Sequence, residues 1–118
     1  MPVHCTAMGK AMLAFSNTDL DRVIERGLTP FTGSTIVEPN AFRAEIAKVG
    51  RSGVAFDREE HVSGFSCVGA PIRNSGRAVG AISLTVSSDA FNPTMPMQIK
   101  HTAEAIWTDL VKARATGA

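Results

Sequence analysis

The stretch from Val54 to Ala70 decides how this chain folds. It reads Val54-Ala-Phe-Asp-Arg-Glu-Glu-His-Val-Ser-Gly-Phe-Ser-Cys-Val-Gly-Ala70. Its first four residues alternate with a period of two, which predicts a strand. Glu59 to Gly64 is polar and predicts a turn, and Phe65 to Ile72 predicts a second strand. The stretch therefore predicts two strands joined by an acidic turn, from which a sheet can be built.

A third apolar run, Ala78 to Val86, is expected to form a hairpin with the second strand. The connection Asn74-Ser75-Gly76 has the chemistry of a three-residue loop, a type I turn followed by a left-handed glycine. That loop predicts a register in which Cys67 lies opposite Ser83, and Phe65 opposite Thr85. All four side chains would then share one side of the sheet. A two-residue loop would shift the register by one residue and separate them.

Helical spacing of apolar residues predicts three helices before the sheet and one after it. We expect them from the N-cap Thr6 to Phe15, from Ser16 or Thr18 to Gly27, from Pro39 to Gly50 or Gly53, and from Ile99 to about Lys112. Residues 28–37 and 88–96 are rich in turn-forming residues and are expected to be loops. Gly9, inside the first helix, indicates the close approach of either another backbone or a ligand. The pattern predicts an α+β fold, an antiparallel sheet flanked by helices.

Composition limits the possible functions. The 118 residues are 44% hydrophobic and 19% charged, which fits one folded domain over residues 1–118. Twelve Lys and Arg against eleven Asp and Glu leave no basic patch, so this chain alone is not expected to bind nucleic acid. The two cysteines lack CxxC spacing, and no stretch has the length of a membrane span, so we expect a cytoplasmic protein.

The predicted face with Phe65, Cys67, Ser83 and Thr85 carries small polar groups where a sealed core would carry large aliphatic ones. Such a face leaves room for a small organic ligand, whose carboxylate or hydroxyl the hydroxyl groups can bind. Asp57 would join this wall if its face turns toward the cavity. In the alternative interpretation, Ser83 and Thr85 satisfy each other beneath a helix, and Cys67 is a small buried hydrophobe.

Catalytic and metal-binding interpretations are less favoured. Asp57, Glu59, Glu60 and His61 could form an acid/base set, but Glu59, Glu60 and His61 are better interpreted as a solvated turn. Cys67 as a nucleophile would need His4 or His61 as its base. The spacing of His4, Cys5, His61 and Cys67 matches no compact metal motif. We therefore expect no catalytic residue, metal or cofactor.

Five segments, in this order, resemble the effector-binding domain of the IclR family of bacterial transcriptional regulators. They are Pro2 to Ala14, Leu28 to Thr32, Gly53 to His61, Gly64 to Ile72 and Gly76 to Leu84. The resemblance implies a GAF-like sensor that binds a small organic acid or aromatic metabolite, between its sheet and the first helix. By position, the effector-binding residues would be Ala7, Met8, Asp57, Phe65, Cys67, Ser83 and Thr85.

The resemblance also implies what this sequence would not contain. A winged helix-turn-helix domain, which carries DNA binding in the family, and the first strands of the sensor would precede Pro2. The chain would then be a partial sensor domain, without enzymatic activity and with a tendency to form homo-oligomers. Two alternatives stay open: a dimerisation module whose cavity is filled by side chains, and a Cys67-dependent enzyme.

Overall fold

The computed structural model describes residues 2–115 and contains four α-helices, three strands and one short 3₁₀ helix within them. The elements are α1 (Ala7–Ala14), α2 (Leu20–Arg26), α3 (Pro39–Ser52), β1 (Ala55–Arg58), β2 (Phe65–Asn74), β3 (Arg77–Ser87), η1 (Ser88–Ala90) and α4 (Met95–Ala115). The strands form one antiparallel sheet in the order β1-β2-β3. The predicted α+β architecture is confirmed.

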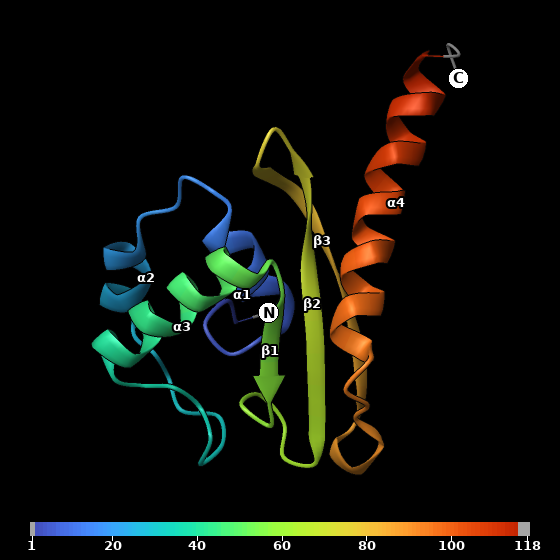
Figure 1. Ribbon diagram of the computed structural model, residues 1–118. Helices are drawn as coiled ribbons and strands as arrows, with labels where there is room; N and C mark the ends of the chain where they lie inside the picture. Colours follow the sequence, from blue (N-terminus) through green and yellow to red (C-terminus); the bar gives the residue numbers. More distant parts are fainter. Residues whose placement is uncertain (1, 116–118) are drawn as a thin grey trace.

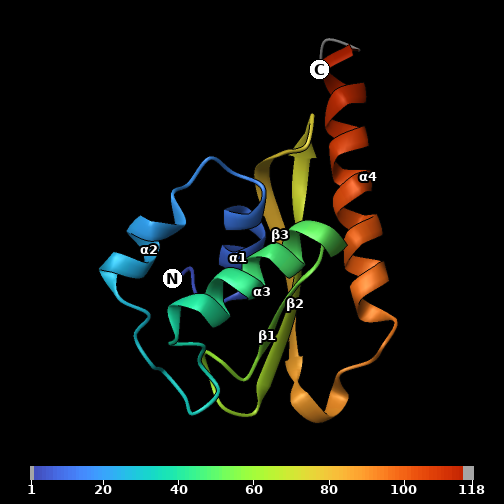
Figure 2. The ribbon, with the colours of Figure 1, turned by 60° about the vertical axis from the view of Figure 1, so that its left-hand side comes forward.

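The helices cover both faces of the sheet, which gives three layers. Figure 1 shows α1, α2 and α3 on one side of the strands and α4 on the other, and Figure 2 shows the same arrangement after rotation. Ala7, Ala11, Val49 and Ala55 form the core between α1, α3 and the sheet. Val54, Val68, Ala70, Ile99 and Ala103 form the core beneath α4.

The ends of the helices follow from local capping. Thr6 caps α1 as predicted, because its hydroxyl accepts a hydrogen bond from the Gly9 amide at 3.2 Å. Pro39 begins α3 and Gly53 ends it, also as predicted. For α2 the predicted end at Gly27 is confirmed, but the predicted start was wrong: Asp19, and not Ser16 or Thr18, is its N-cap. The last helix begins earlier than expected, at Met95.

The hairpin register differs from the prediction. The turn has two central residues, Ser75 and Gly76, whose φ angles of 52° and 83° are typical of a type I′ turn. Cys67 consequently lies opposite Thr85, not Ser83, while Phe65 lies opposite Ser87. A register shift between Ile72 and Arg73, where β3 carries one extra residue, moves the pairing by one more position. The predicted residues therefore stay on one side of the sheet, although their pairing differs.

Two glycines let α1 lie very close to its neighbours. A Cβ on Gly69 would meet the backbone of Ala7 at 3.1 Å, and a Cβ on Gly9 would meet the backbone of Val3 at 2.5 Å. Backbone contact thus explains Gly9, in agreement with the first of the two interpretations. The approach at Gly69 seats the start of α1 directly on β2.

Candidate functional site

A cavity of about 340 Å³ opens on the side of the sheet that α1 and α3 cover. Its lining comes from β1, β2, β3 and the turn between β1 and β2: Asp57, His61, Val62, Phe65, Cys67 and Thr85. Its volume is in the range of pockets for small ligands. Four of the seven predicted site residues line it.

The polar part of the cavity is a row across the three strands. Asp57 pairs with Cys67, and Cys67 pairs with Thr85. The Cys67 Sγ and Thr85 Oγ1 atoms lie 3.1 Å apart, and Asp57 is 3% exposed. Alternating strand residues point to the same face, which brings these three side chains together. The row offers a carboxylate, a thiol and a hydroxyl to one ligand.

Burial raises the pKa of the Cys67 thiol, and the Asp57 carboxylate acts in the same direction. The hydrogen bond with Thr85 opposes them but does not reverse the shift. Cys67 is therefore a neutral thiol at neutral pH. A thiol in this state is a hydrogen-bonding group and a poor nucleophile.

The remaining wall is formed by the turn between β1 and β2 and by the first residue of β2. Val62 and Phe65 supply apolar surface, and His61 lies edge-on to Phe31, with ring centroids 5.3 Å apart. Among the lining residues within the described chain, Asp57 is the only carboxylate and there is no lysine or arginine. One side of the cavity is thus apolar, and the other side carries hydrogen-bond acceptors.

The interpretation of Glu59, Glu60 and His61 as a solvated turn was wrong for Glu60, whereas Glu59 and His61 are half-buried. Glu60 is 4% exposed, and its carboxylate binds the ammonium of Lys10, which has no exposed surface. Glu59 has a φ of 58° and binds the Gly64 amide through its carboxylate at 2.6 Å. This is an ordered turn, and its His61 contributes to the cavity.

Three predicted residues lie outside the lining. Ser83 lies opposite Gly69, one row further from the cavity than Thr85, with its side chain exposed. Ala7 is buried against Gly69, the residue that pairs with Ser83, where α1 contacts β2. Met8 is half-buried on α1. The structure therefore brings together Asp57, Phe65, Cys67 and Thr85, and not all seven predicted residues.

Two kinds of residue at or near the cavity were not predicted from the sequence. His61 and Val62 line the cavity because the ordered turn folds back, which no periodicity reveals. Lys10 is a lone charge in the run Ala7-Met-Gly-Lys-Ala-Met-Leu13. A charge inside an otherwise apolar or small-residue run was the available signal that this lysine needs a buried acidic partner.

Within residues 2–115, no group of three or more His, Cys, Asp or Glu side chains is arranged to hold a metal ion. No helix in this range has both the length and the apolar character required to cross a membrane.

The chain thus has a three-layer α+β fold with a cavity beside its sheet. Comparison with known families is more specific, because residues 1–114 match the model of the bacterial transcriptional regulator IclR C-terminal domain. The chain belongs to the IclR family of transcriptional regulators. It is 33% identical to the DNA-binding transcriptional repressor YiaJ of Escherichia coli, over 93% of this chain and 42% of that protein. The chain thus spans under half the length of this relative.

Solved structures show the same fold. The crystal structure of transcriptional regulator YaiJ superposes with a TM-score of 0.84 at 34% identity, over 93% of this chain and 66% of that one. An IclR homolog from Microbacterium hydrocarbonoxydans, complexed with 4-hydroxybenzoate, has a TM-score of 0.88 at 23% identity, over 95% and 47% of the two chains. YiaJ is named a transcriptional repressor and YaiJ a transcriptional regulator.

Proposed function

We propose that this chain is the effector-sensing domain of a bacterial transcriptional regulator and that the cavity holds its effector, a small organic acid or aromatic metabolite. The observation that carries the proposal is the row Asp57, Cys67 and Thr85 beside the apolar Val62 and Phe65, in a space of about 340 Å³. A few placed polar groups on an apolar lining are typical of small-molecule sites.

The charges of the lining indicate how the effector would be oriented. Asp57 is a buried acceptor without a lysine or arginine beside it in the described lining, so the ligand group facing it should donate a hydrogen bond. A ligand carboxylate would lie away from Asp57, because two facing carboxylates repel each other. The ligand of the Microbacterium relative, 4-hydroxybenzoate, has a ring, a hydroxyl and a carboxylate at opposite ends, so it is a suitable probe.

Sensing would reach DNA through a winged helix-turn-helix domain outside residues 1–118. A ligand that binds one conformation of the regulator more tightly shifts the population toward it, and the difference in affinity sets the size of the shift. On this proposal residues 1–118 form a single partial sensor domain, which acts in the cytoplasm and has no catalytic role. The neutral state of Cys67 supports the non-catalytic assignment.

We also propose that the domain associates with a second copy of itself. In the described chain β3 pairs with β2 on one side only. Beyond the sheet, the stripe of α4 that begins with the buried Ile99 and Ala103 continues through Ile106 to Leu110, which is 49% exposed. Figure 1 shows this end of α4 projecting past the strands. The spacing of four, three and four residues is that of a helix pair.

Charge along α4 supports an antiparallel pair of copies. If two copies cross at Thr108, Ile106 of one lies opposite Leu110 of the other, and Glu104 lies opposite Lys112. A hollow of about 310 Å³ beside Trp107, between α4 and the β2–β3 turn, would receive side chains of the partner. A dimer would thus bury the exposed apolar part of the helix.

Binding to the cavity is tested by calorimetric titration of the domain with 4-hydroxybenzoate, phenol, benzoate and small 2-hydroxy acids. We expect hydroxylated compounds to bind, and benzoate, which lacks the hydroxyl, to bind at least about 10-fold more weakly than 4-hydroxybenzoate. Thr85→Val should weaken binding, whereas Thr102→Val, on α4 at the other face of the sheet, should not. Equal binding by both variants would refute the site, and absence of binding by every compound would favour the dimerisation module.

A further inference from the structure

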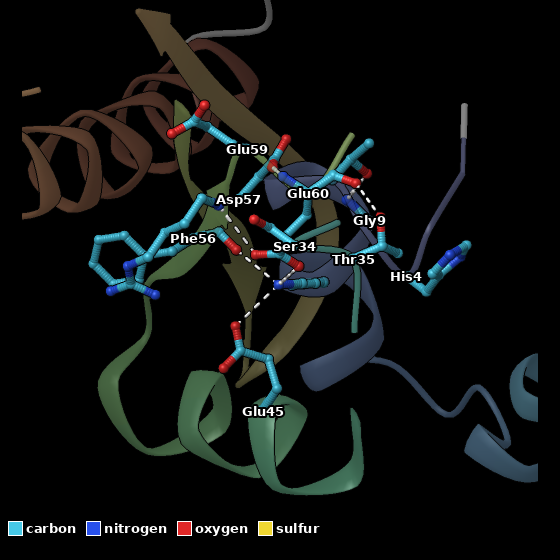
Figure 3. Close-up of polar contacts among 12 residues, drawn as sticks. His4, Gly9, Ser34, Thr35, Glu45, Phe56, Asp57, Glu59 and Glu60 are labelled. Atoms are coloured by element: carbon cyan, nitrogen blue, oxygen red, sulfur yellow. Dashed lines mark hydrogen bonds and ion pairs between the residues drawn. The ribbon is translucent and has the colours of Figure 1, made fainter. Parts of the chain in front are cut away.

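Lys10 lies behind the cavity with none of its surface exposed, although lysine is among the residues least often buried. Its ammonium donates three hydrogen bonds: to Glu45 Oε2 at 2.9 Å, to the Phe56 carbonyl at 2.8 Å and to Glu60 Oε1 at 2.6 Å. Figure 3 shows these partners, which come from α3, from β1 and from the turn that follows β1. All three donors of the ammonium are used, which offsets the cost of burying the charge.

Two of these three acceptors lie on either side of Asp57 in the sequence. The Phe56 carbonyl precedes Asp57, and the Glu60 side chain follows it. The second oxygen of Glu60 accepts a hydrogen bond from the Arg58 amide at 3.1 Å, and the Glu60 amide donates to Asp57 Oδ1 at 2.8 Å. A continuous series of hydrogen bonds thus runs from Lys10 through Glu60 to the Asp57 carboxylate, which lines the cavity.

The backbone of the turn has further supports that do not involve Lys10. The Thr32 hydroxyl donates to the Glu59 carbonyl, and the Thr35 hydroxyl donates to the Glu60 carbonyl, each at 2.5 Å. Loss of Lys10 would leave these bonds in place but would leave the buried Glu60 carboxylate without its ammonium partner. Because an unpaired buried charge is unfavourable, the Glu60 side chain would move toward water and lose its bond with the Arg58 amide. The strand on both sides of Asp57 would then lose two supports, the bond from Lys10 to the Phe56 carbonyl and the bond from the Arg58 amide to Glu60, so Asp57 would be held less firmly.

We propose that Lys10 is a positioning residue of the site: it holds Asp57 in the orientation that faces the effector, although it does not line the cavity itself. The structural part of this inference rests on the hydrogen bonds alone. Its consequence for affinity rests on the proposed function.

The test uses Cys67 as a reporter inside the cavity, without any ligand. Asp57 pairs with Cys67 and raises the pKa of its thiol, and His61 is the other titratable lining residue. The rate of alkylation of Cys67 by iodoacetamide is measured against pH, with peptide mapping to separate it from Cys5. In Lys10→Met, we expect the midpoint of the profile to fall below that of the wild type, because Asp57 is held less closely to Cys67, whereas burial, the larger cause of the raised thiol pKa, remains. Lys48→Met removes an exposed lysine on α3 and should leave the profile unchanged.

Circular dichroism establishes that the variants are folded. If Lys10→Met does not fold, Glu60→Gln replaces it, since this variant keeps the shape of the side chain and removes the charge that Lys10 binds. The same downward change is expected. A folded variant whose profile coincides with that of the wild type would overturn the positioning role.

Titration with 4-hydroxybenzoate then separates the two proposals. If the wild type binds, we expect Lys10→Met or Glu60→Gln to weaken binding about 10-fold or more, whereas Lys48→Met should bind normally. An altered Cys67 profile with no binding by the wild type would contradict 4-hydroxybenzoate as an effector but support the positioning role. If a folded variant keeps both the Cys67 alkylation profile and the affinity for 4-hydroxybenzoate of the wild type, the positioning role is contradicted and the proposed effector site is not.

Discussion

The pKa of the Cys5 thiol depends on the same charged residues that hold the turn between β1 and β2. Its side chain has no exposed surface, and burial raises the pKa of its thiol from 9.0 to about 11. Asp57 and Glu60 act in the same direction, and Lys10 opposes them. The Cys5 thiol is therefore close enough to Asp57, Glu60 and Lys10 for their charges to change its pKa.

Stability should consequently fall in alkaline solution. Because the pKa of Cys5 is higher in the folded state, its contribution is fully present below pH 9 and is lost as the pH rises to about 11. The difference corresponds to about 3 kcal/mol in the free energy of unfolding. Urea denaturation between pH 8 and 11 should show this loss in the wild type, and a smaller loss in Cys5→Ala. Parallel pH curves for the two proteins would contradict it.

The sequence predicts the position and burial of some residues better than those of others. Cys67 could be placed on one face with Phe65 because strand alternation is a local property. That Asp57 shares this face depends on the pairing of β1 with β2, which the sequence left open. Glu60 could not, since its burial depends on Lys10, which lies 50 positions earlier in the chain. A carboxylate in a polar turn resembles a solvated one until its distant partner is known.

At the level of the elements, the hairpin was predicted correctly in its faces but not in its pairing. Turn chemistry alone did not distinguish a three-residue loop from the two-residue turn at Ser75 and Gly76. The irregularity at Ile72 and Arg73 adds the further shift that keeps Cys67 and Thr85 on the same side. The shorter turn shifts the predicted pairing by one residue, and the bulge shifts it by one more. Because a shift of two residues returns each side chain to the same face of the sheet, the predicted faces are correct although the pairs are not.

The contact between α1 and β2 gives a second test. Gly69→Ala should reduce the free energy of unfolding by about 1–3 kcal/mol, because the added methyl group would meet the Ala7 backbone at 3.1 Å. Gly80→Ala is the matched control, since a Cβ there meets only the Ile72 side chain, at 3.8 Å. Urea denaturation should show Gly80→Ala unchanged or slightly stabilised. Equal losses in the two variants would contradict the tight seating of α1.

For the whole molecule, the proposed association of two copies through α4 can be tested by light scattering coupled to size exclusion. We expect the wild type to be a dimer and Leu110→Glu to be a monomer, because the new charges would face an apolar surface. His101→Glu lies on an exposed part of the same helix, away from the stripe, and should remain dimeric. A monomeric wild type, or a dimeric Leu110→Glu, would exclude this interface.

The central claim is that the cavity beside Asp57, Cys67 and Thr85 holds the effector. A crystal structure of the domain, grown with the compound that binds most tightly in the calorimetric titrations, tests it most directly. The account predicts ligand density in this cavity, with a donor group of the ligand within hydrogen-bonding distance of Asp57. Density elsewhere, such as in the hollow between α4 and the β2–β3 turn, with an empty cavity beside Asp57, would contradict it.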